Sequence, residues 1–110
     1  MISQKKNNYI LLRDEKDDAV KFADFIGSIH HQFENDNLVI DLLKYGQLQL
    51  NELLAYLEIS NHHRSSKKSF VIVNDTINID EVPEELNVVP TLVEAEDMVN
   101  MEELERELGF

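Results

Sequence analysis

The chain has 110 residues, of which 22 are acidic and 10 are Lys or Arg, and its formal net charge at neutral pH is −12. This length suits a single hydrophobic core, so we predict one domain over residues 1–110. The charge argues against direct binding of nucleic acid or of an anionic membrane surface, because both require a basic face. The absence of cysteine excludes disulfides, thiol catalysis and thiolate metal sites.

The sequence has neither a signal-peptide pattern nor an apolar run near the roughly 20 residues that span a bilayer. We therefore expect a cytoplasmic protein. Acidic residues are concentrated toward the C-terminus, where residues 80–110 contain eleven of them and a single basic residue, Arg106. This run favours either a solvated helix face or an electrostatic guide for a basic partner protein.

In chain order, the hydrophobic pattern alternates between strands and helices. Residues 8–12 predict a strand, and residues 17–33 predict a helix with one apolar face. The run at 38–42 is almost continuously apolar, which predicts a central strand covered on both sides. Residues 47–60 repeat leucine at helical spacing, and residues 70–73 predict a second central strand.

The last third of the chain predicts one weak strand and a helical segment. The strand is expected at residues 86–89. Thr91 and Glu94 have the spacing of a capping box, which predicts a helix start. The pattern leaves open whether residues 91–108 form one helix or two helices kinked at Asn100. Together these elements predict an α/β fold with about four strands in a mostly parallel sheet and helices packed on it.

The residue types that commonly carry catalysis are not arranged in a familiar motif. The four histidines form two adjacent pairs, His30 with His31 and His62 with His63, and neighbours on a helix point about 100° apart. We therefore expect each histidine pair to be structural or solvated, and a metal site is the less favoured alternative. We also expect no cofactor. There is no glycine-rich phosphate loop and no nucleophile elbow, so we predict that the chain is not an enzyme.

Asp41 differs from the other carboxylates because it lies within the apolar run at 38–42. It either caps the following turn or faces a functional crevice at the strand end. A response-regulator receiver would also need an acid there, and Asp14 and Glu15 could mimic its acidic pair. The strand expected at 70–73 is not followed by the lysine that a receiver requires, which disfavours this alternative.

Residues 37–110 resemble the STAS domain, the fold of anti-sigma factor antagonists. The segments that carry the resemblance are an Asp-Leu strand, a helix, a basic linker with the next strand, and the start of the last helix, at residues 39–42, 50–57, 64–73 and 91–95. The phosphorylated serine of the family would fall at or beside Leu50, but residues 42–59 contain no Ser or Thr. The resemblance implies a degenerate member without a phosphorylation switch, whose N-terminal hairpin is reduced to the strand at 8–12.

The same resemblance implies a non-catalytic protein-interaction module that binds an anti-sigma-factor-like kinase. Its docking surface would lie around the start of the helix that follows the Asp-Leu strand. Tyr45 is there either as the aromatic anchor of an interface or as a cover for the core edge. The residues expected on this surface are Asp41, Lys44, Tyr45, Gln47, Gln49, Asn51 and Glu52.

The C-terminal residues 89–110 also resemble a group of short bacterial proteins, some of which carry a ribonuclease Z label. That enzyme class needs a metal-binding cluster of histidine and aspartate, which this sequence lacks. The resemblance therefore implies an alternative function, in which the chain is an accessory subunit of an RNA-processing metallo-hydrolase.

Overall fold

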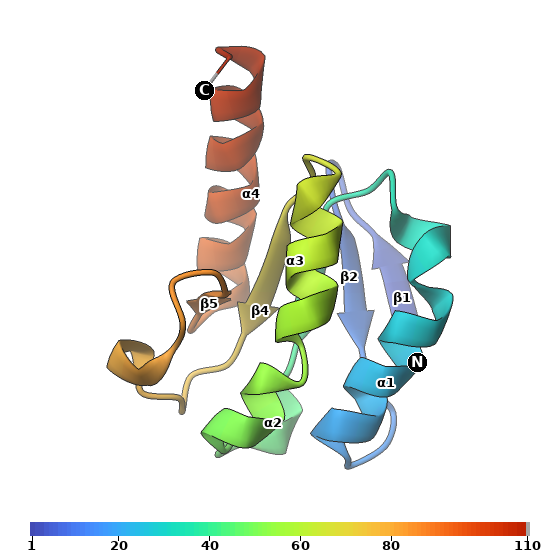
Figure 1. The fold of residues 1–110 in the computed structure, drawn as a ribbon, viewed down its shortest axis with the longest axis vertical. Helices are drawn as coiled ribbons and strands as arrows, with labels where there is room; N and C mark the ends of the chain where they lie inside the picture. Colours follow the sequence, from blue (N-terminus) through green and yellow to red (C-terminus); the bar gives the residue numbers. More distant parts are fainter. Residues whose placement is uncertain (110) are drawn as a thin grey trace.

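A computed structural model describes residues 1–109, within which five strands form one sheet (Figure 1). The strands are β1 at Ile2–Lys5, β2 at Ile10–Arg13, β3 at Leu38–Asp41, β4 at Phe70–Val73 and β5 at Asn87–Val89. They lie side by side in the order of the sequence. β1 runs antiparallel to β2, and the pairs β2–β3, β3–β4 and β4–β5 are parallel.

Helices cover both faces of the sheet. They are α1 at Ala19–Ile29, α2 at Leu50–Leu54, α3 at Leu57–Ser65 and α4 at Leu92–Glu107. Two crossovers, β2–α1–β3 and β3–α2–α3–β4, advance in the same direction, and right-handed crossovers of this kind place their helices on one face. The connection from β4 to β5 contains only a 3₁₀ turn, and α4 packs on the opposite face against β3, β4 and β5.

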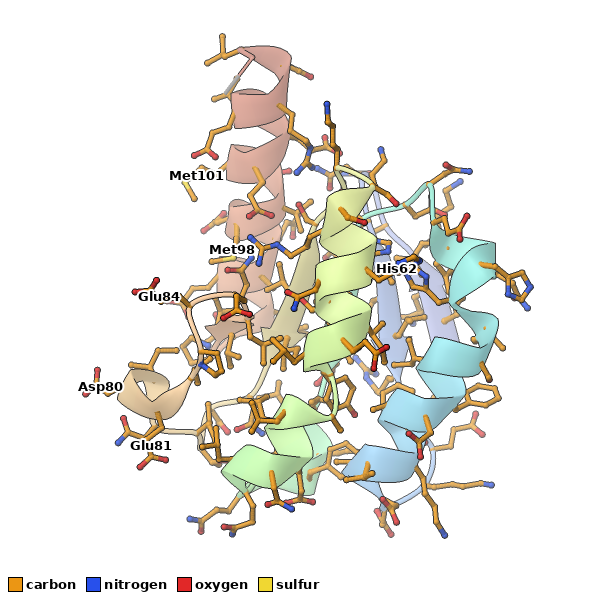
Figure 2. The ribbon with its side chains drawn as sticks, in the orientation of Figure 1. His62, Asp80, Glu81, Glu84, Met98 and Met101 are labelled. Carbon is orange, nitrogen blue, oxygen red and sulfur yellow. The ribbon has the colours of Figure 1, made fainter. Side chains whose placement is uncertain are left out.

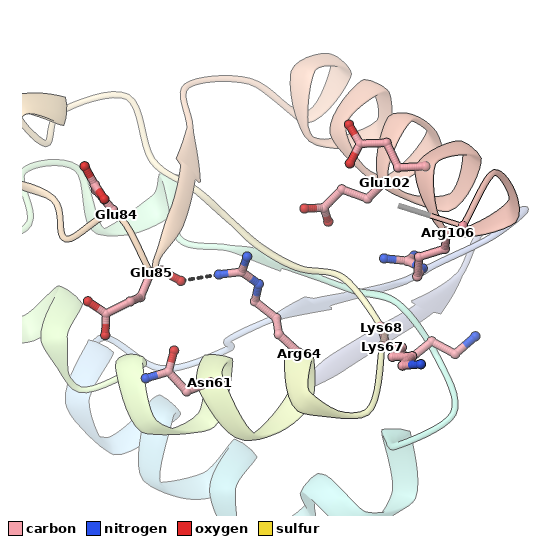
Figure 3. Close-up of a pocket in the computed structure, with 10 residues that line it drawn as sticks. Asn61, Arg64, Lys67, Lys68, Glu84, Glu85, Glu102 and Arg106 are labelled. Atoms are coloured by element: carbon pink, nitrogen blue, oxygen red, sulfur yellow. Dashed lines mark hydrogen bonds between the residues drawn. The ribbon is translucent and has the colours of Figure 1, made fainter.

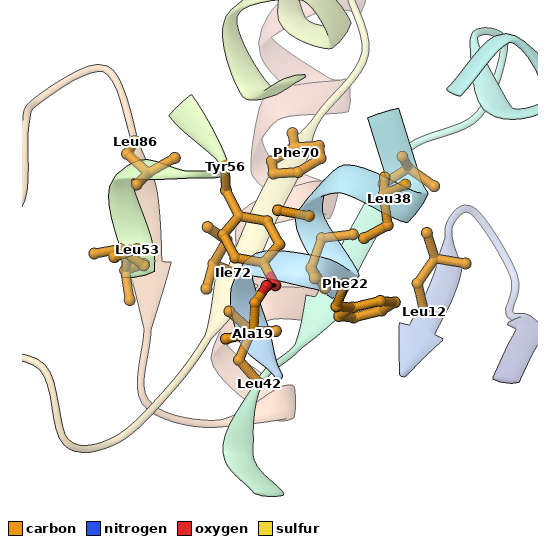
Figure 4. Packing of buried hydrophobic residues seen from close by; sticks show 14 of the residues in the cluster. Leu12, Ala19, Phe22, Leu38, Leu42, Leu53, Tyr56, Phe70, Ile72 and Leu86 are labelled. Carbon is orange, nitrogen blue, oxygen red and sulfur yellow. Dashed lines mark hydrogen bonds between the residues drawn. The ribbon is translucent and has the colours of Figure 1, made fainter. Parts of the chain in front are cut away.

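Burial on both faces explains the continuous apolar runs, because every residue of β3 and β4 is buried. Alternate side chains enter the larger cluster beneath α1, α2 and α3, which includes Leu38, Ile40, Phe70 and Ile72 (Figure 4). Tyr56 is fully buried in this cluster, and its hydroxyl donates to the Ala19 carbonyl at 2.7 Å. The remaining side chains pack under α4 in a second cluster of Val39, Val71, Val73, Ala95 and Val99.

The strand count corrects the prediction of about four strands to five. Only one of the four residues of β1 is apolar, and all four are exposed, so this strand contributes little to the core. It is held through its backbone, with Ile2 opposite Arg13 and Lys5 opposite Ile10. The expected reduction of the N-terminal hairpin to a single strand is therefore wrong, because β1 and β2 form an antiparallel pair.

Two expected helices are each divided. The helix expected over 17–33 consists of α1 followed by a 3₁₀ turn at His30–Phe33. The helix expected over 47–60 is interrupted at Ala55 and Tyr56, which separate α2 from α3.

The sequence left open whether residues 91–108 form one helix or two. The structure has one helix, because α4 continues through Asn100. Its N-terminus has the predicted cap, in which the Glu94 amide donates to the Thr91 hydroxyl at 3.1 Å. Within residues 1–109, no helix combines the length and the apolar character needed to cross a membrane.

Candidate protein-binding surface

The residues expected to bind a partner lie at the edge of the sheet where the parallel strands end. β2, β3, β4 and β5 are parallel, so their carboxyl ends meet at one edge. Polar residues follow or finish three of these strands: Asp14, Asp41 and Asn74. The connection from β3 to α2 crosses the same edge, and we call its outer face, with the first turn of α2, the docking surface.

Asp41 supports this connection. Asp41 is 6% exposed, and its carboxylate accepts hydrogen bonds from Nε of Arg13 and from the Leu43 amide, each at 3.0 Å. Arg13 is its direct neighbour on β2. The expectation that Asp41 caps the following turn is confirmed, and both carboxylate oxygens are engaged by groups of the fold.

Asn74 and Thr76 hold the connection from the other side. Nδ2 of Asn74 donates to the carbonyls of Leu42 and Gly46, both at 3.1 Å, and the Thr76 hydroxyl donates to the Gly46 carbonyl at 2.8 Å. Gly46 has a φ of +61°, which favours glycine. Sequence analysis did not assign this role to Asn74, although an Asn directly after a buried strand is a typical turn-forming residue.

Tyr45 covers the edge of the core and is tied to the end of β2. It is half-buried against the larger cluster, and its hydroxyl donates to the Asp14 carboxylate. Burial and this carboxylate raise the pKa of the Tyr45 phenol. Burial alone would raise the pKa of Asp14, but hydrogen bonds from Tyr45 and from the Lys16 and Glu15 amides outweigh it and lower that pKa. The Tyr45 hydroxyl, which would be the polar group of an interface anchor, is therefore already hydrogen-bonded within the chain.

The other expected residues differ in their contacts within the chain, and Nζ of Lys44 lies 3.5 Å both from Oδ1 of Asp17 and from the Asp14 carbonyl oxygen. Glu52 accepts from the Gln49 amide at 2.9 Å and so caps the start of α2. Leu50, at the position of the family's switch serine, is the first residue of α2. Four side chains of the docking surface are exposed to a partner: Lys44, Gln47, Gln49 and Asn51.

Partly apolar hollows lie at both ends of this edge. Beside β4 and β5, Ile79 is 59% exposed over a hollow of about 470 Å³ whose lining includes Ile77, Val88 and Pro90. Beside β2, Phe25 is 47% exposed and borders a smaller hollow of about 290 Å³ that Asp14 also lines. Exposed apolar groups that border a hollow are surface that a protein partner can bury.

A third hollow, between α3 and α4, contains four of the ten basic residues of this acidic chain (Figure 3). Arg64, Lys67, Lys68 and Arg106 line it, and Arg64 donates to the Glu85 carbonyl. Four glutamates line the same hollow, namely Glu84, Glu85, Glu102 and Glu105. The opposite charges are equal in number, so the hollow does not have the cationic excess that a phosphate site needs.

The two histidine pairs, which lie far apart in the sequence, meet between α1 and α3. Nε2 of His30 and Nδ1 of His63 are 2.7 Å apart, and Nε2 of His63 lies 2.7 Å from the Asp36 carbonyl. The His62 ring stands edge-on to the His30 ring at 5.2 Å between centroids. Figure 2 shows His62 pointing from α3 toward the segment that follows α1. Sequence analysis considered each pair by itself and missed this contact.

The hydrogen bonds of this cluster fix its proton positions. A carbonyl only accepts, so Nε2 of His63 carries the proton that it donates to Asp36. Burial lowers the pKa of His63 to about 4, so its Nδ1 is unprotonated near neutral pH and accepts from Nε2 of His30. Burial and the neighbouring His62 also lower the pKa of His30. With Nε2 of His30 bonded to His63, Nδ1 is the ring nitrogen of His30 that makes no hydrogen bond within this cluster.

The chain has thus two distinct surfaces of interest, the docking surface at the sheet edge and the histidine cluster between α1 and α3. No protein-family model matches this chain, and a search of curated proteins finds no match.

Proposed function

We propose that this chain is a non-catalytic protein-interaction module of the STAS type, and that its partner docks on the docking surface. One observation carries the proposal. The buried polar groups of this edge, Asp14, Asp41 and Asn74, are all used to hold the connection from β3 to α2, while the side chains on its outer face are exposed. Such an edge is a preorganised platform, which lowers the entropy lost on binding.

The order of elements supports the STAS resemblance more fully than the sequence did. The N-terminal hairpin that the family contains is present as β1 and β2. The Asp-Leu strand is followed by a connection and a helix that begins at Leu50, and the last helix begins after Thr91. Because a leucine stands at the switch position, the interaction we propose is not controlled by serine phosphorylation there.

The chemistry of the edge supports binding over catalysis. A general base works best with a pKa near the working pH and with free access to a substrate proton. The pKa of Asp14 is lowered, which moves it away from neutrality. Asp41 is almost inaccessible and accepts two structural hydrogen bonds. Both carboxylates therefore act as supports for the connection.

A pair of matched variants tests the docking surface. Asn51 and Asn7 are both exposed, but Asn51 lies on the first turn of α2 and Asn7 lies in the β1–β2 turn at the opposite edge of the sheet. We expect Asn51→Trp to block docking sterically and Asn7→Trp to leave it intact. The binding partner in the assay is the purified anti-sigma-factor-like kinase from the same cell, measured by calorimetry.

The kinase is expected to bind the wild-type chain and the Asn7→Trp variant equally, and Asn51→Trp at least about tenfold more weakly, a loss of about 1.4 kcal/mol. Equal binding of both variants would move the interface elsewhere. Absence of kinase binding, together with binding of a ribonuclease Z-type metallo-hydrolase, would replace the proposal with the accessory-subunit function.

A further inference from the structure

The histidine cluster brings together donor atoms that a transition metal requires. His30 follows α1, Glu34 lies one turn later, and His62 is on α3. Each of these three residues offers one ligand atom, and all three atoms lie within 4.8 Å of one another. His30 is buried, whereas Glu34 and His62 are exposed.

The distances allow coordination after small side-chain rotations. Metal–ligand bonds of about 2.0–2.2 Å in a tetrahedral site separate neighbouring ligand atoms by about 3.3–3.5 Å. Two ligand atoms that are now 4.8 Å apart must therefore approach one another by a little over 1 Å. The two exposed side chains, Glu34 and His62, are free to make this adjustment while His30 stays fixed by its neighbours.

An independent feature prepares His30 as a ligand. Metal-binding histidines typically donate their other ring N–H to a neighbouring acceptor, which fixes the tautomer and the ring orientation. Here Nε2 of His30 donates to Nδ1 of His63, which is itself oriented by its bond to the Asp36 carbonyl. Because Nε2 of His30 is held by His63, Nδ1 is the ring nitrogen of His30 that is not engaged within the cluster.

The surroundings favour a cation and keep it accessible. A hollow of about 500 Å³ between α1 and α3 is lined by His30, Glu34 and His62 and also by Asp24 and Glu58. Glu58 precedes His62 by four residues on α3, so the two side chains lie on one face of that helix. These carboxylates attract divalent cations, and a path from solvent to the three ligands is open.

We propose that His30, Glu34 and His62 form a binding site for a single borderline transition-metal ion of the zinc class. Two imidazoles and one carboxylate suit Zn²⁺, whereas Mg²⁺ and Ca²⁺ prefer oxygen ligands alone. Three protein ligands leave a coordination position for water or for a side chain of a partner. The bound ion would connect the segment after α1 to α3, on the face of the sheet that α1, α2 and α3 cover. The expectation of no metal site depended on treating each histidine pair separately, and the site that we propose takes one ligand from each pair.

Zinc titration of the tag-free, metal-free chain tests this site. Competition with a chromophoric chelator near neutral pH is expected to give one equivalent of saturable binding. Cobalt in place of zinc should give the visible absorption of a tetrahedral site. The ligand variants are His62→Ala and Glu34→Gln, both at exposed positions, and the control is His31→Ala, an exposed histidine outside the three-residue group.

We expect each ligand variant to weaken zinc binding by at least about tenfold and the control to leave it unchanged. Thermal midpoints measured without metal show whether the variants remain folded. The proposal fails if the wild-type chain binds no zinc stoichiometrically, or if His62→Ala binds it as tightly as the wild type. Equal losses in His31→Ala and His62→Ala would also overturn the assigned ligand set.

Discussion

Replacing Asn74 with alanine tests whether the docking surface is rigid because of buried hydrogen bonds. The Asn74 side chain is 3% exposed. It donates to the carbonyls of Leu42 and Gly46 and accepts from the amides of Thr76 and Ile77. Asn74→Ala therefore removes the side-chain hydrogen bonds from the end of β4 to the connection between β3 and α2.

The expected loss of stability follows from which groups lose their last partner. The Leu42 carbonyl still accepts from the Tyr45 amide, and the Gly46 carbonyl from the Thr76 hydroxyl. The amides of Thr76 and Ile77 lose their side-chain acceptor, and both residues are open enough for water to replace part of it. At about 1 kcal/mol for a typical hydrogen bond, and more for a group left buried without one, we expect a loss of about 2–3 kcal/mol.

Asn78→Ala is the matched control, because Asn78 makes one exposed cap bond to the Asp80 amide at 3.0 Å. We expect this variant to lose only about 0.5–1 kcal/mol. Urea unfolding followed by far-UV circular dichroism measures both variants, and the slope of the free energy with urea should stay constant. Equal midpoints for Asn74→Ala and Asn78→Ala would show that Asn74 does not hold the connection in place.

Three further predictions concern acid stability, salt and modification. The folded-state pKa of Asp14 is lowered, so its stabilising contribution is complete above the ordinary carboxyl range near 4 and is lost as the pH falls through the folded pKa. Asp14→Asn should therefore flatten the curve of stability against pH below about 4, and an unchanged curve would contradict the role of its hydrogen bonds. If Glu94, Glu96 and Asp97 guide a basic partner, added salt should slow association in stopped-flow measurements more than it speeds dissociation; an association rate indifferent to salt would leave these charges as solvating groups. Peptide mapping of the chain from its native cell should find no phosphate on residues 42–59, which contain no Ser or Thr, and a phosphopeptide from this segment would show that the alignment with the STAS family is wrong.

The central strands could be predicted from the sequence because their environment is uniform. β3 and β4 are buried on both faces, so their residues are apolar without interruption. β1 could not be predicted in this way, because an exposed edge strand is selected for its backbone pairing and leaves no periodic pattern. The hydrophobic pattern alone therefore does not predict the hairpin of β1 and β2.

The break between α2 and α3 has a tertiary cause. Leucines continue at helical spacing through residues 50–57, and no glycine or proline marks the interruption. Tyr56, at the break, is fully buried and bonds the Ala19 carbonyl on α1. A contact across 37 residues therefore accompanies a boundary that local propensity does not indicate.

The candidate sites differ in how far local pattern determines them. The docking surface follows from a strand end and the next helix, which are adjacent in sequence, so most of its residues could be named in advance. Its supports, Asp14 and Asn74, come from the ends of other strands and require the parallel sheet to bring them together. The register of β2 beside β3 explains why Arg13 meets Asp41.

The histidine cluster depends wholly on the packing of α1 against α3. Adjacent histidines diverge on their own helix, so each pair taken alone predicts two unrelated side chains. Once the helices pack on one face of the sheet, His30 and His63 come into contact across 33 residues, and His62 is brought beside them. Nε2 of His63 then contacts the Asp36 carbonyl, and its Nδ1 contacts Nε2 of His30, so the two rings orient one another. The metal-binding capacity that we propose is thus a property of the assembled fold, which explains why a search for metal motifs along the sequence does not find it.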